Sequence, residues 1–274
     1  AKQDLAYTGT EDVIPFIAII LIVAIITGIL TAFYALSGVL GLRGDDEMLS
    51  SEMTTTNFGS TEIDTLEIEI AYSELTIKKS DSLKVETNNN NIKVNQENKE
   101  LQIKEKKHKW FSINERQELI VYIPEDLKIE KVRIVTGAGK INIENLKTES
   151  LVFELGAGET TIEKLNVKDD CKIESGAGKV SITSGIINNL KLDMGVGETN
   201  LNTILTGKNE INAGIGNLNI NLQNGKENYR IKTDKGIGTI KIDGKEISNN
   251  ELYGNGSHSI DVDGGIGNIK IEFK

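Results

Sequence analysis

A Gly-x-Gly triplet recurs through the second half of the chain, and this repeat limits the folds open to the sequence more than any other feature. The first glycines of successive triplets are separated by 19, 20, 19, 19, 22 and 29 residues. Apolar residues at alternate positions follow the triplets, as at Ile141 and Ile143, and an apolar residue such as Phe153 precedes most of them by three positions. Two strands in a period of about 20 residues are typical of one coil of a β-solenoid, whose coils must stack because none buries its apolar side alone.

The glycines mark the places where we expect each coil to turn. Glycine adopts positive φ without the steric cost of a Cβ atom, which suits a tight corner. The residue between the glycines is always apolar, and we expect it to point inward, into a space that widens toward the C-terminus: Ala138, Ala157, Ala177, Val196, Ile215, Ile237 and Ile266. The predicted structural corners are Gly137, Gly139, Gly156, Gly158, Gly176, Gly178, Gly195, Gly197, Gly214, Gly216, Gly236, Gly238, Gly265 and Gly267.

In-register stacking of these units predicts two further features. The residue after the second glycine alternates in charge through Lys140, Glu159, Lys179 and Glu198, which indicates a ladder of ion pairs. Exposed pairs contribute only about 0.2–1 kcal/mol each, so the ladder would help to set register more than to hold the fold. The same register aligns Cys171 with Leu151 and Leu190, so we expect a buried and unreactive thiol.

The region before the triplets carries the same alternation in shorter pieces. Leu66 and Ile68, and later Leu101 and Ile103, are typical of strands with one buried face. We therefore predict N-terminal β coils over residues 61–135 and a Gly-x-Gly β-repeat region over residues 136–274. The predicted fold class is all-β: a β-solenoid-like stack of Gly-x-Gly repeats, preceded by a single N-terminal transmembrane α-helix.

Residues 13–42 form a run of 30 positions without a charged residue. A helix needs about 20 apolar residues to cross the hydrocarbon core, so this run predicts a transmembrane helix with the lipid bilayer as its partner, and it could also carry a homo-oligomer. A short polar tail, residues 1–12, precedes it, and the acidic Ser/Thr-rich segment 43–60 predicts a flexible linker. Lys2 and Arg43 flank the run with one cation each, so charge leaves the orientation open.

Composition and motifs argue against catalysis, cofactors and nucleic acid. One cysteine and two histidines offer neither a disulfide framework nor a Cys-based zinc site, and we expect no metal and no cofactor. Gly-Ala-Gly-Lys at 137–140 and 176–179 lacks the spacing and the following helix of a phosphate loop. The net charge of −10 without a basic stripe argues against nucleic-acid binding. Some β-solenoids cleave polysaccharides with clustered carboxylates, whereas the charges here alternate in sign, so we expect no enzyme.

One segment combines lysines with aromatic residues and is our candidate contact for an anionic surface. It consists of Lys104, Lys106, Lys107, Lys109, Trp110 and Phe111. Lysines beside exposed aromatic rings can seat on anionic lipid headgroups or on an anionic wall polymer. The alternative is a solvated hairpin tip whose aromatic side chains cover the end of the solenoid.

The segment Leu119 to Lys128, which reads Leu-Ile-Val-Tyr-Ile-Pro-Glu-Asp-Leu-Lys, and the Gly-Ala-Gly-Lys/Glu repeats that follow it resemble the bacterial DUF4097 family, often labelled as adhesins. The resemblance covers about residues 60–274. It implies a β-strand-repeat domain on the cell envelope, often tethered by a membrane helix and sometimes linked to envelope-stress systems. It supplies no active site.

These observations lead to one functional hypothesis and two alternatives. The leading hypothesis is a membrane-tethered extracytoplasmic β-repeat interaction module, adhesin-like or a cell-envelope scaffold, whose partner is another envelope protein or an anionic surface polymer. It implies a single-pass protein of the cell membrane with the β domain outside. The first alternative is a pilin-like filament subunit assembled through its N-terminal hydrophobic helix. The second is an accessory protein of envelope-stress regulation.

Overall fold

The computed structural model describes residues 52–59, 62–106, 117–249 and 251–274. This part of the chain contains seventeen strands, β1 to β17, and one short 3₁₀ turn, η1 (Lys226–Asn228), so the predicted all-β class is confirmed. The predicted tail (1–12), the predicted transmembrane helix (13–42) and residues 43–51 of the predicted linker lie outside the described residues. In the described ranges, no helix is both long and apolar enough to cross a membrane.

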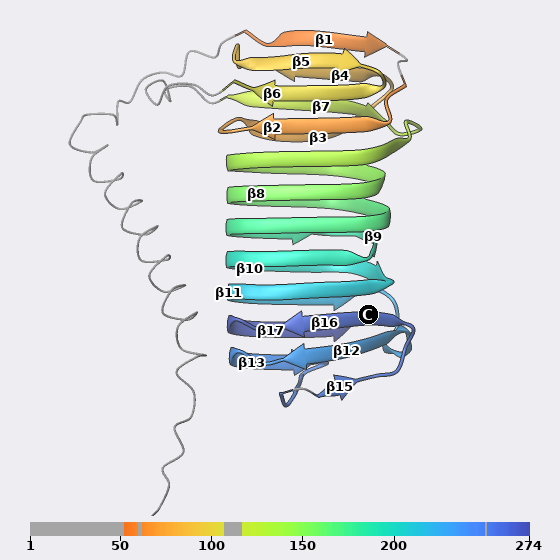
Figure 1. Ribbon diagram of the computed structural model, residues 1–274, viewed down its shortest axis with the longest axis vertical. Coiled ribbons are helices and arrows are strands. Elements are labelled where there is room, and N and C mark those ends of the chain that lie inside the picture. The colour runs from red at the N-terminus through yellow and green to blue at the C-terminus, as the bar shows by residue number, and fades with distance from the viewer. Residues whose placement is uncertain (1–51, 60–61, 107–116, 250) are drawn as a thin grey trace, which may run out of the picture. The chain divides into compact units, whose positions relative to one another are not determined.

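The Gly-x-Gly region winds into stacked parallel coils. β8 (Ile129–Ile182) runs continuously through three corners, and β10 (Leu190–Thr206) and β11 (Lys208–Leu222) add one corner each (Figure 1). The corners align in register, because Gly197 of β10 pairs with Gly178 on one side and with Gly216 on the other. β9 (Gly185–Asn188) adds a short third side to the coils, between β8 and β10.

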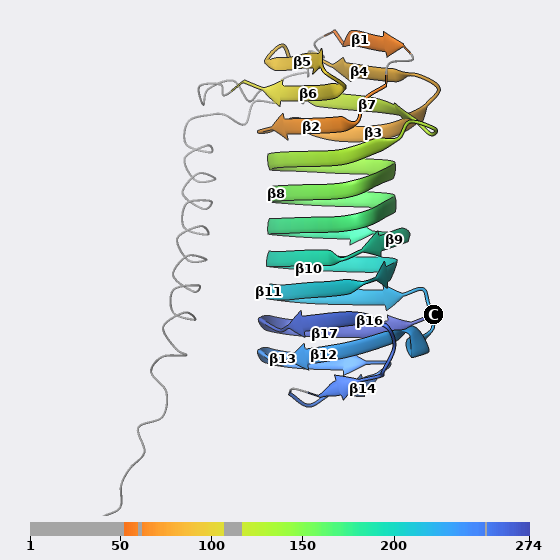
Figure 2. The ribbon, with the colours of Figure 1, turned by 45° about the vertical axis from the view of Figure 1, so that its right-hand side comes forward.

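Hydrogen bonds join the strands into one continuous sheet, which the corners fold into two facing layers (Figures 1 and 2). The half of each coil before its corner lies in one layer and the half after it in the other. Alternate side chains point between the layers, and these are almost completely buried, as for Phe153, Ile162, Leu192 and Leu201. Neighbouring strands in such a ladder lie about 4.8 Å apart, so each coil adds one row of apolar side chains to a shared core.

The N-terminal end continues the stack and then closes it with antiparallel strands. β2 (Thr65–Ile70) and β3 (Glu74–Ser80) form a coil on β8, and β6 (Glu100–Glu105) and β7 (Glu118–Pro124) form the next. β5 (Ile92–Glu97) pairs antiparallel with β6, and β4 (Leu83–Thr87) pairs antiparallel with β7.

β1 (Thr54–Gly59) pairs antiparallel with β4 and lies inside the segment that we predicted as a flexible linker. That prediction is wrong for these six residues. Their β-branched threonines favour a strand, and Phe58 packs against the core. The polar composition of the segment hides this contact, since only one large apolar side chain anchors it.

The C-terminal coils do not stack in the order of the sequence. β16 (His258–Asp263) and β17 (Ile266–Phe273) lie between β11 and the coil formed by β12 (Tyr229–Asp234) and β13 (Ile237–Ile242) (Figure 1). β14 (Lys245–Glu246) and β15 (Leu252–Tyr253) pair antiparallel with β13 and β12 at the far end of the stack. The expectation that successive units stack in the order of the sequence is therefore wrong for the β12–β13 coil, which β16 and β17 separate from β11.

Candidate functional site

The corners of the β2–β3 coil and of the Gly-x-Gly coils meet along one side of the β domain, where the chain passes from one layer to the other. β2 and β3 meet in a corner made by Ala71, Tyr72 and Ser73, and Ala138 N–H donates a hydrogen bond to the carbonyl of Ala71 at 2.8 Å. The stacking order of corner triplets from this end is 71–73, 137–139, 156–158, 176–178, 195–197, 214–216, 265–267 and 236–238. We call this column of corners the corner edge.

The tight stacking at the corner edge explains why both triplet positions are glycine. Gly197 has φ of +141°, a conformation that residues with a Cβ atom rarely adopt. A Cβ atom on Gly195 would also collide with the carbonyl oxygen of Gly176 in the coil before it. The neighbouring backbone therefore leaves no room for a side chain at either glycine.

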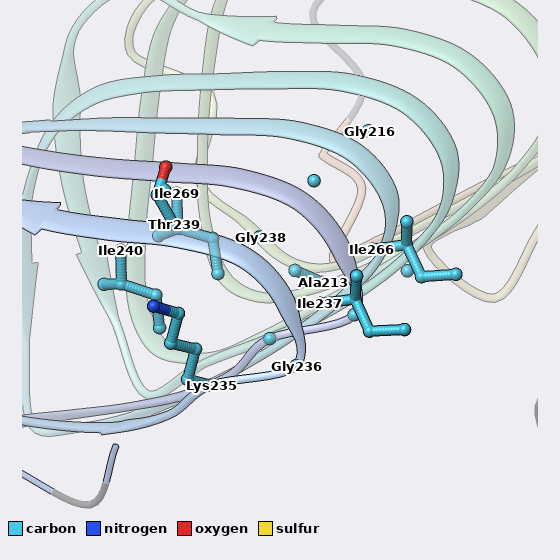
Figure 3. A pocket seen from close by; sticks show the side chains of 14 residues that line it. Ala213, Gly216, Lys235, Gly236, Ile237, Gly238, Thr239, Ile240, Ile266 and Ile269 are labelled. Carbon is cyan, nitrogen blue, oxygen red and sulfur yellow. The ribbon is translucent and has the colours of Figure 1, made fainter. Parts of the chain in front are cut away.

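The apolar residue between the glycines points outward, so our expectation that it fills an inner space is wrong. Val196 is 39% exposed and Ile237 is 59% exposed. Figure 3 shows Ile237 and Ile266 on the outside of the bend, whereas Ile240 and Ile269 lie farther along their strands, where both are buried. The stacked glycine backbones occupy the inside of each corner, and the middle side chain can extend only away from it.

The outward side chains form a continuous apolar line, which we call the corner ridge. In stacking order it consists of Tyr72, Ala138, Ala157, Ala177, Val196, Ile215, Ile266 and Ile237. Its side chains grow from alanine in the middle of the stack to isoleucine at the β13 end. Tyr72, 53% exposed, closes the opposite end. Three of the six exposed large apolar residues in the described part of the chain therefore lie on this one line.

The column beside the ridge on the strands that follow the corners is the predicted charge ladder. Lys140 Nζ lies 3.9 Å from a carboxylate oxygen of Glu159, and Lys179 Nζ lies 3.6 Å from one of Glu198, which confirms two of the predicted pairs. Hydrogen bonding from Asn200 and the nearby Lys179 charge lower the pKa of Glu198.

Beyond Glu198 the same column is uncharged. Asn268 Nδ2 donates to Asn217 Oδ1 at 3.4 Å, and Thr239 Oγ1 donates to Asn268 Oδ1 at 2.8 Å. We call Asn217, Asn268 and Thr239 the neutral column, and they flank the isoleucines of the ridge.

The column on the other side of the ridge is acidic. It contains, in stacking order, Glu154, Glu174, Asp193, Asn212, Asp263 and Asp234, and we call it the acidic column. Glu154 and Glu174 are paired with Arg133 at 2.9 Å and with Lys172 at 2.5 Å. Asp193, Asp234 and Asp263 form no ion pair with any described residue. The ridge therefore has carboxylates on one flank and neutral polar groups on the other where its side chains are largest.

The predicted anionic-surface contact is only partly within the described residues. Lys104 Nζ lies 2.7 Å from Glu67, whose hydrogen bond is the main cause of the raised Lys104 pKa, so this lysine is already paired. Lys106 is exposed at the end of the described segment, and its N–H donates to the carbonyl of Asn91 at 3.0 Å. Lys107, Lys109, Trp110 and Phe111 lie outside the described residues, and their role stays a prediction.

The corner at Tyr72 was not identified from the sequence, because it lacks glycine. Its backbone is held instead by the Glu105 carboxylate, which accepts hydrogen bonds from Ala71 N–H at 2.6 Å and Tyr72 N–H at 3.2 Å. Asn89 Nδ2 donates to the same carboxylate at 2.9 Å. The available signal was a small-x-small triplet between two alternating segments, which is weaker than Gly-x-Gly.

The described residues show no grouping typical of a metal centre. They contain no cluster of three or more His, Cys, Asp or Glu side chains that could hold a metal ion. A small pocket at the last corners is lined mainly by glycines and isoleucines (Figure 3). Its one charged side chain, Lys235, is paired with Glu246 at 3.2 Å. Cys171 is 1% exposed and in register with Leu190, which confirms the expected burial, and desolvation raises its pKa.

These features define a repetitive all-β domain whose distinctive chemistry lies on an exposed edge. The sequence model of the Toastrack DUF4097 family matches residues 49–263, and the chain belongs to this family. The resemblance that we noted from the Pro-Glu-Asp-Leu segment and the repeats is thus confirmed at the level of the family.

Comparison with solved structures gave matches at low sequence identity. A "putative adhesin" from Bacteroides fragilis is 13% identical, with a TM-score of 0.50, over 82% of this chain and 100% of that one. A "putative cell adhesion protein" from Clostridium sporogenes is 16% identical, with a TM-score of 0.38, over 81% and 99% of the two chains. Comparison with curated proteins gave no match.

Proposed function

We propose that this protein is a membrane-tethered, extracytoplasmic interaction module, adhesin-like or a scaffold of the cell envelope. Residues 13–42 would anchor it in the bilayer, and the Toastrack domain would present its corner edge to a partner. The observation that carries the proposal is the corner ridge, an ordered line of outward apolar side chains, of which Tyr72, Val196 and Ile237 are exposed.

The ridge supports binding because its exposed apolar atoms are hydrated in the isolated domain. Burial of such surface contributes about 25 cal/mol per Å². The ridge is also preorganised, since its inner residues, from Ala138 to Ile266, each lie at a corner that is stacked between two others. A partner would therefore lose little affinity to the ordering of the binding surface.

The tether rests on the sequence. A run of 30 residues without a charge is long enough to span a bilayer with some tilt. Placement of the β domain outside the cytoplasm rests on the envelope location that the family resemblance implies.

Cysteine labelling on intact cells tests the extracytoplasmic placement of the domain, and salt extraction of membranes tests the tether. Lys241 is exposed on β13, so a Lys241→Cys variant offers an accessible thiol, while the buried Cys171 serves as an internal silent site. We expect a membrane-impermeant maleimide to label the variant on intact cells and the parent chain only after denaturation. Labelling of the variant only after the cells are permeabilised would refute an extracytoplasmic domain. Release of the chain from membranes by high salt alone would refute the tether.

Electron microscopy of material sheared from the cells separates this proposal from the filament alternative. An interaction module leaves the chain with the membrane fraction as single copies. Fibres that are labelled through the same Lys241→Cys thiol would favour a filament subunit and contradict a module that acts singly.

A further inference from the structure

We propose that the wide half of the corner ridge, formed by Val196, Ile215, Ile266 and Ile237, binds an amphipathic helix of a partner protein whose apolar stripe is bordered by lysine or arginine. This inference rests on the proposed function and names the class of partner that the interaction module takes.

The four side chains form one straight apolar strip. Val196 is the register partner of Ile215, Ile215 of Ile266, and Ile266 of Ile237, so they project from adjacent strands at the same point of the corner. At about 4.8 Å per strand the strip is roughly 14 Å long. Val196 and Ile237 at its ends are exposed, and Ile215 and Ile266 between them are half-buried, so all four offer surface to a partner.

The spacing of the strip matches a helix better than a strand. Residues on one face of a strand recur at about 6.7 Å, whereas one turn of an α-helix advances 5.4 Å. A helix laid along the stack would therefore place one apolar side chain between successive ridge residues, with a drift of about 2 Å over the strip. Anchors at i, i+3 or i+4, and i+7 are the known pattern of helix recognition by an apolar surface.

The charges beside the strip specify a basic partner. Asp193, Asp263 and Asp234 stand on one flank without an ion-pair partner among the described residues, while the neutral column occupies the other. Lysine or arginine on one edge of the helix stripe would pair with these carboxylates. Electrostatic complementarity of this kind sets the orientation and the association rate more than the affinity.

The same charges argue against two other occupants. A second copy related by a two-fold axis perpendicular to the stack would bring the acidic columns of the two molecules together. A two-fold axis parallel to the stack would face the carboxylates with Asn217, Asn268 and Thr239, which offer no countercharge. An anionic lipid surface would be repelled by the same aspartates.

Binding of a designed probe to the full chain in zwitterionic nanodiscs tests the inference. The probe is a labelled peptide of about 18 residues with leucine at i, i+3, i+4 and i+7 spacing and lysine along one border. A second peptide replaces each lysine by glutamate, and empty nanodiscs measure binding to lipid. Fluorescence anisotropy over the lipid background reports the affinity.

We expect the lysine peptide to bind and the glutamate peptide not to bind. A V196S/I237S variant should weaken binding at least about tenfold, because two exposed apolar anchors are removed. Asp234→Asn with Asp263→Asn should weaken it less and should flatten its dependence on salt. Ile186→Ser is the matched control, since Ile186 is 47% exposed but lies on β9, off the ridge, and should leave binding unchanged.

Two results would overturn the inference. One is equal affinity of the parent chain and the V196S/I237S variant for the lysine peptide, or no binding by the parent. The other is an equal loss in the Ile186→Ser control. Circular dichroism of each variant verifies the fold, which these exposed substitutions should preserve. Neither result changes the outcome of the Lys241→Cys labelling experiment, so a failure of the helix-binding inference can be distinguished from a failure of the proposed extracytoplasmic role.

Discussion

Gly216 and Gly267 are register partners in adjacent parallel strands, although the Gly236 corner lies between them in the sequence. Gly238 is the equivalent glycine of the corner that comes next in the sequence after Gly216, and it pairs with Gly267 from the opposite side. The last coil is thus held between two coils that were synthesised before it. β11 and β13 each pair with β17 and not with each other, so a disturbance of β17 removes the strand pairing of both coils at this point.

Substitution of Gly267 by alanine should therefore destabilise the domain strongly. Gly267 has φ of +144°, and a Cβ atom there would collide with the carbonyl oxygen of Gly216. We expect a loss of more than about 3 kcal/mol in the free energy of unfolding, measured by denaturant titration. Gly244→Ala is the control, because Gly244 also has positive φ, +76°, but open space around its Cβ position. It should cost only about 1–2 kcal/mol, and equal losses in the two variants would show that stacking at the corner is not the cause.

The repeat, the corners and the all-β class are predictable because each depends on local chemistry. The role of a glycine at positive φ, such as Gly197, can be predicted from its residue type. The burial of alternating residues, such as Leu192 and Leu201, can be predicted from their spacing in the sequence. The stacking order of the last coils cannot be predicted in this way. Which of two similar coils stacks on β11 depends on a reversal through β14 and β15, two strands of two residues each, and no local pattern reveals it.

The candidate surface was less predictable, since side-chain direction at the corner depends on the neighbouring coil. An apolar residue between two glycines looks like a core residue from the sequence, and the inward direction we expected for Val196 and Ile237 follows from that rule. The stacked backbones exclude it from the interior instead. Tyr72 shows the same limit, because its corner is held by the distant Glu105 carboxylate and carries no glycine.

Asn89 should be essential to the glycine-free corner. Its Nδ2 lies 2.9 Å from Ser73 Oγ, 2.9 Å from Glu105 Oε1 and 2.7 Å from Gln117 Oε1, and the residue is 2% exposed. Asn89→Ala removes the donor that these acceptors share, and we expect a loss of about 2–3 kcal/mol in denaturant titration. Asn95→Ala, on the exposed side of β5, should change stability by less than about 0.5 kcal/mol. A loss at Asn89 no larger than at Asn95 would contradict a supporting role.

Cys171 should be inert in the folded protein. The thiol is 1% exposed, and burial raises its pKa, so the reactive thiolate is scarce at neutral pH. We expect reaction with a coloured thiol reagent only at the rate of unfolding, whereas the Lys241→Cys thiol reacts at once. Cys171→Val keeps the volume and polarity of the site and should change stability by less than about 1.5 kcal/mol. Rapid modification of the native parent chain would show that the core opens locally.

Glu86 should make the stability of the N-terminal end depend on acid pH. Lys84 Nζ lies 2.8 Å from its Oε1, and Tyr122 O–H donates to its Oε2 at 2.8 Å. The hydrogen bond from Lys84, followed by that from Tyr122, lowers the pKa of Glu86. A carboxyl whose folded pKa lies below its unfolded value contributes stability above the unfolded pKa, about 4.3, and loses it as pH falls through the folded pKa.

The pH dependence can be isolated by comparing two glutamine variants. Glu86→Gln should be less stable than the parent chain at pH 7, and the difference should shrink as the pH falls below about 4. Glu97→Gln is the control, because Glu97 is exposed on β5 and forms no ion pair with any described residue. Thermal unfolding followed by circular dichroism gives the Tm of each variant at each pH. The plot of Tm against pH for Glu97→Gln should run parallel to that of the parent chain over the same range. A constant gap between the Glu86→Gln and parent curves down to pH values well below 4 would mean that the contacts with Lys84 and Tyr122 do not depend on the charge of the carboxylate.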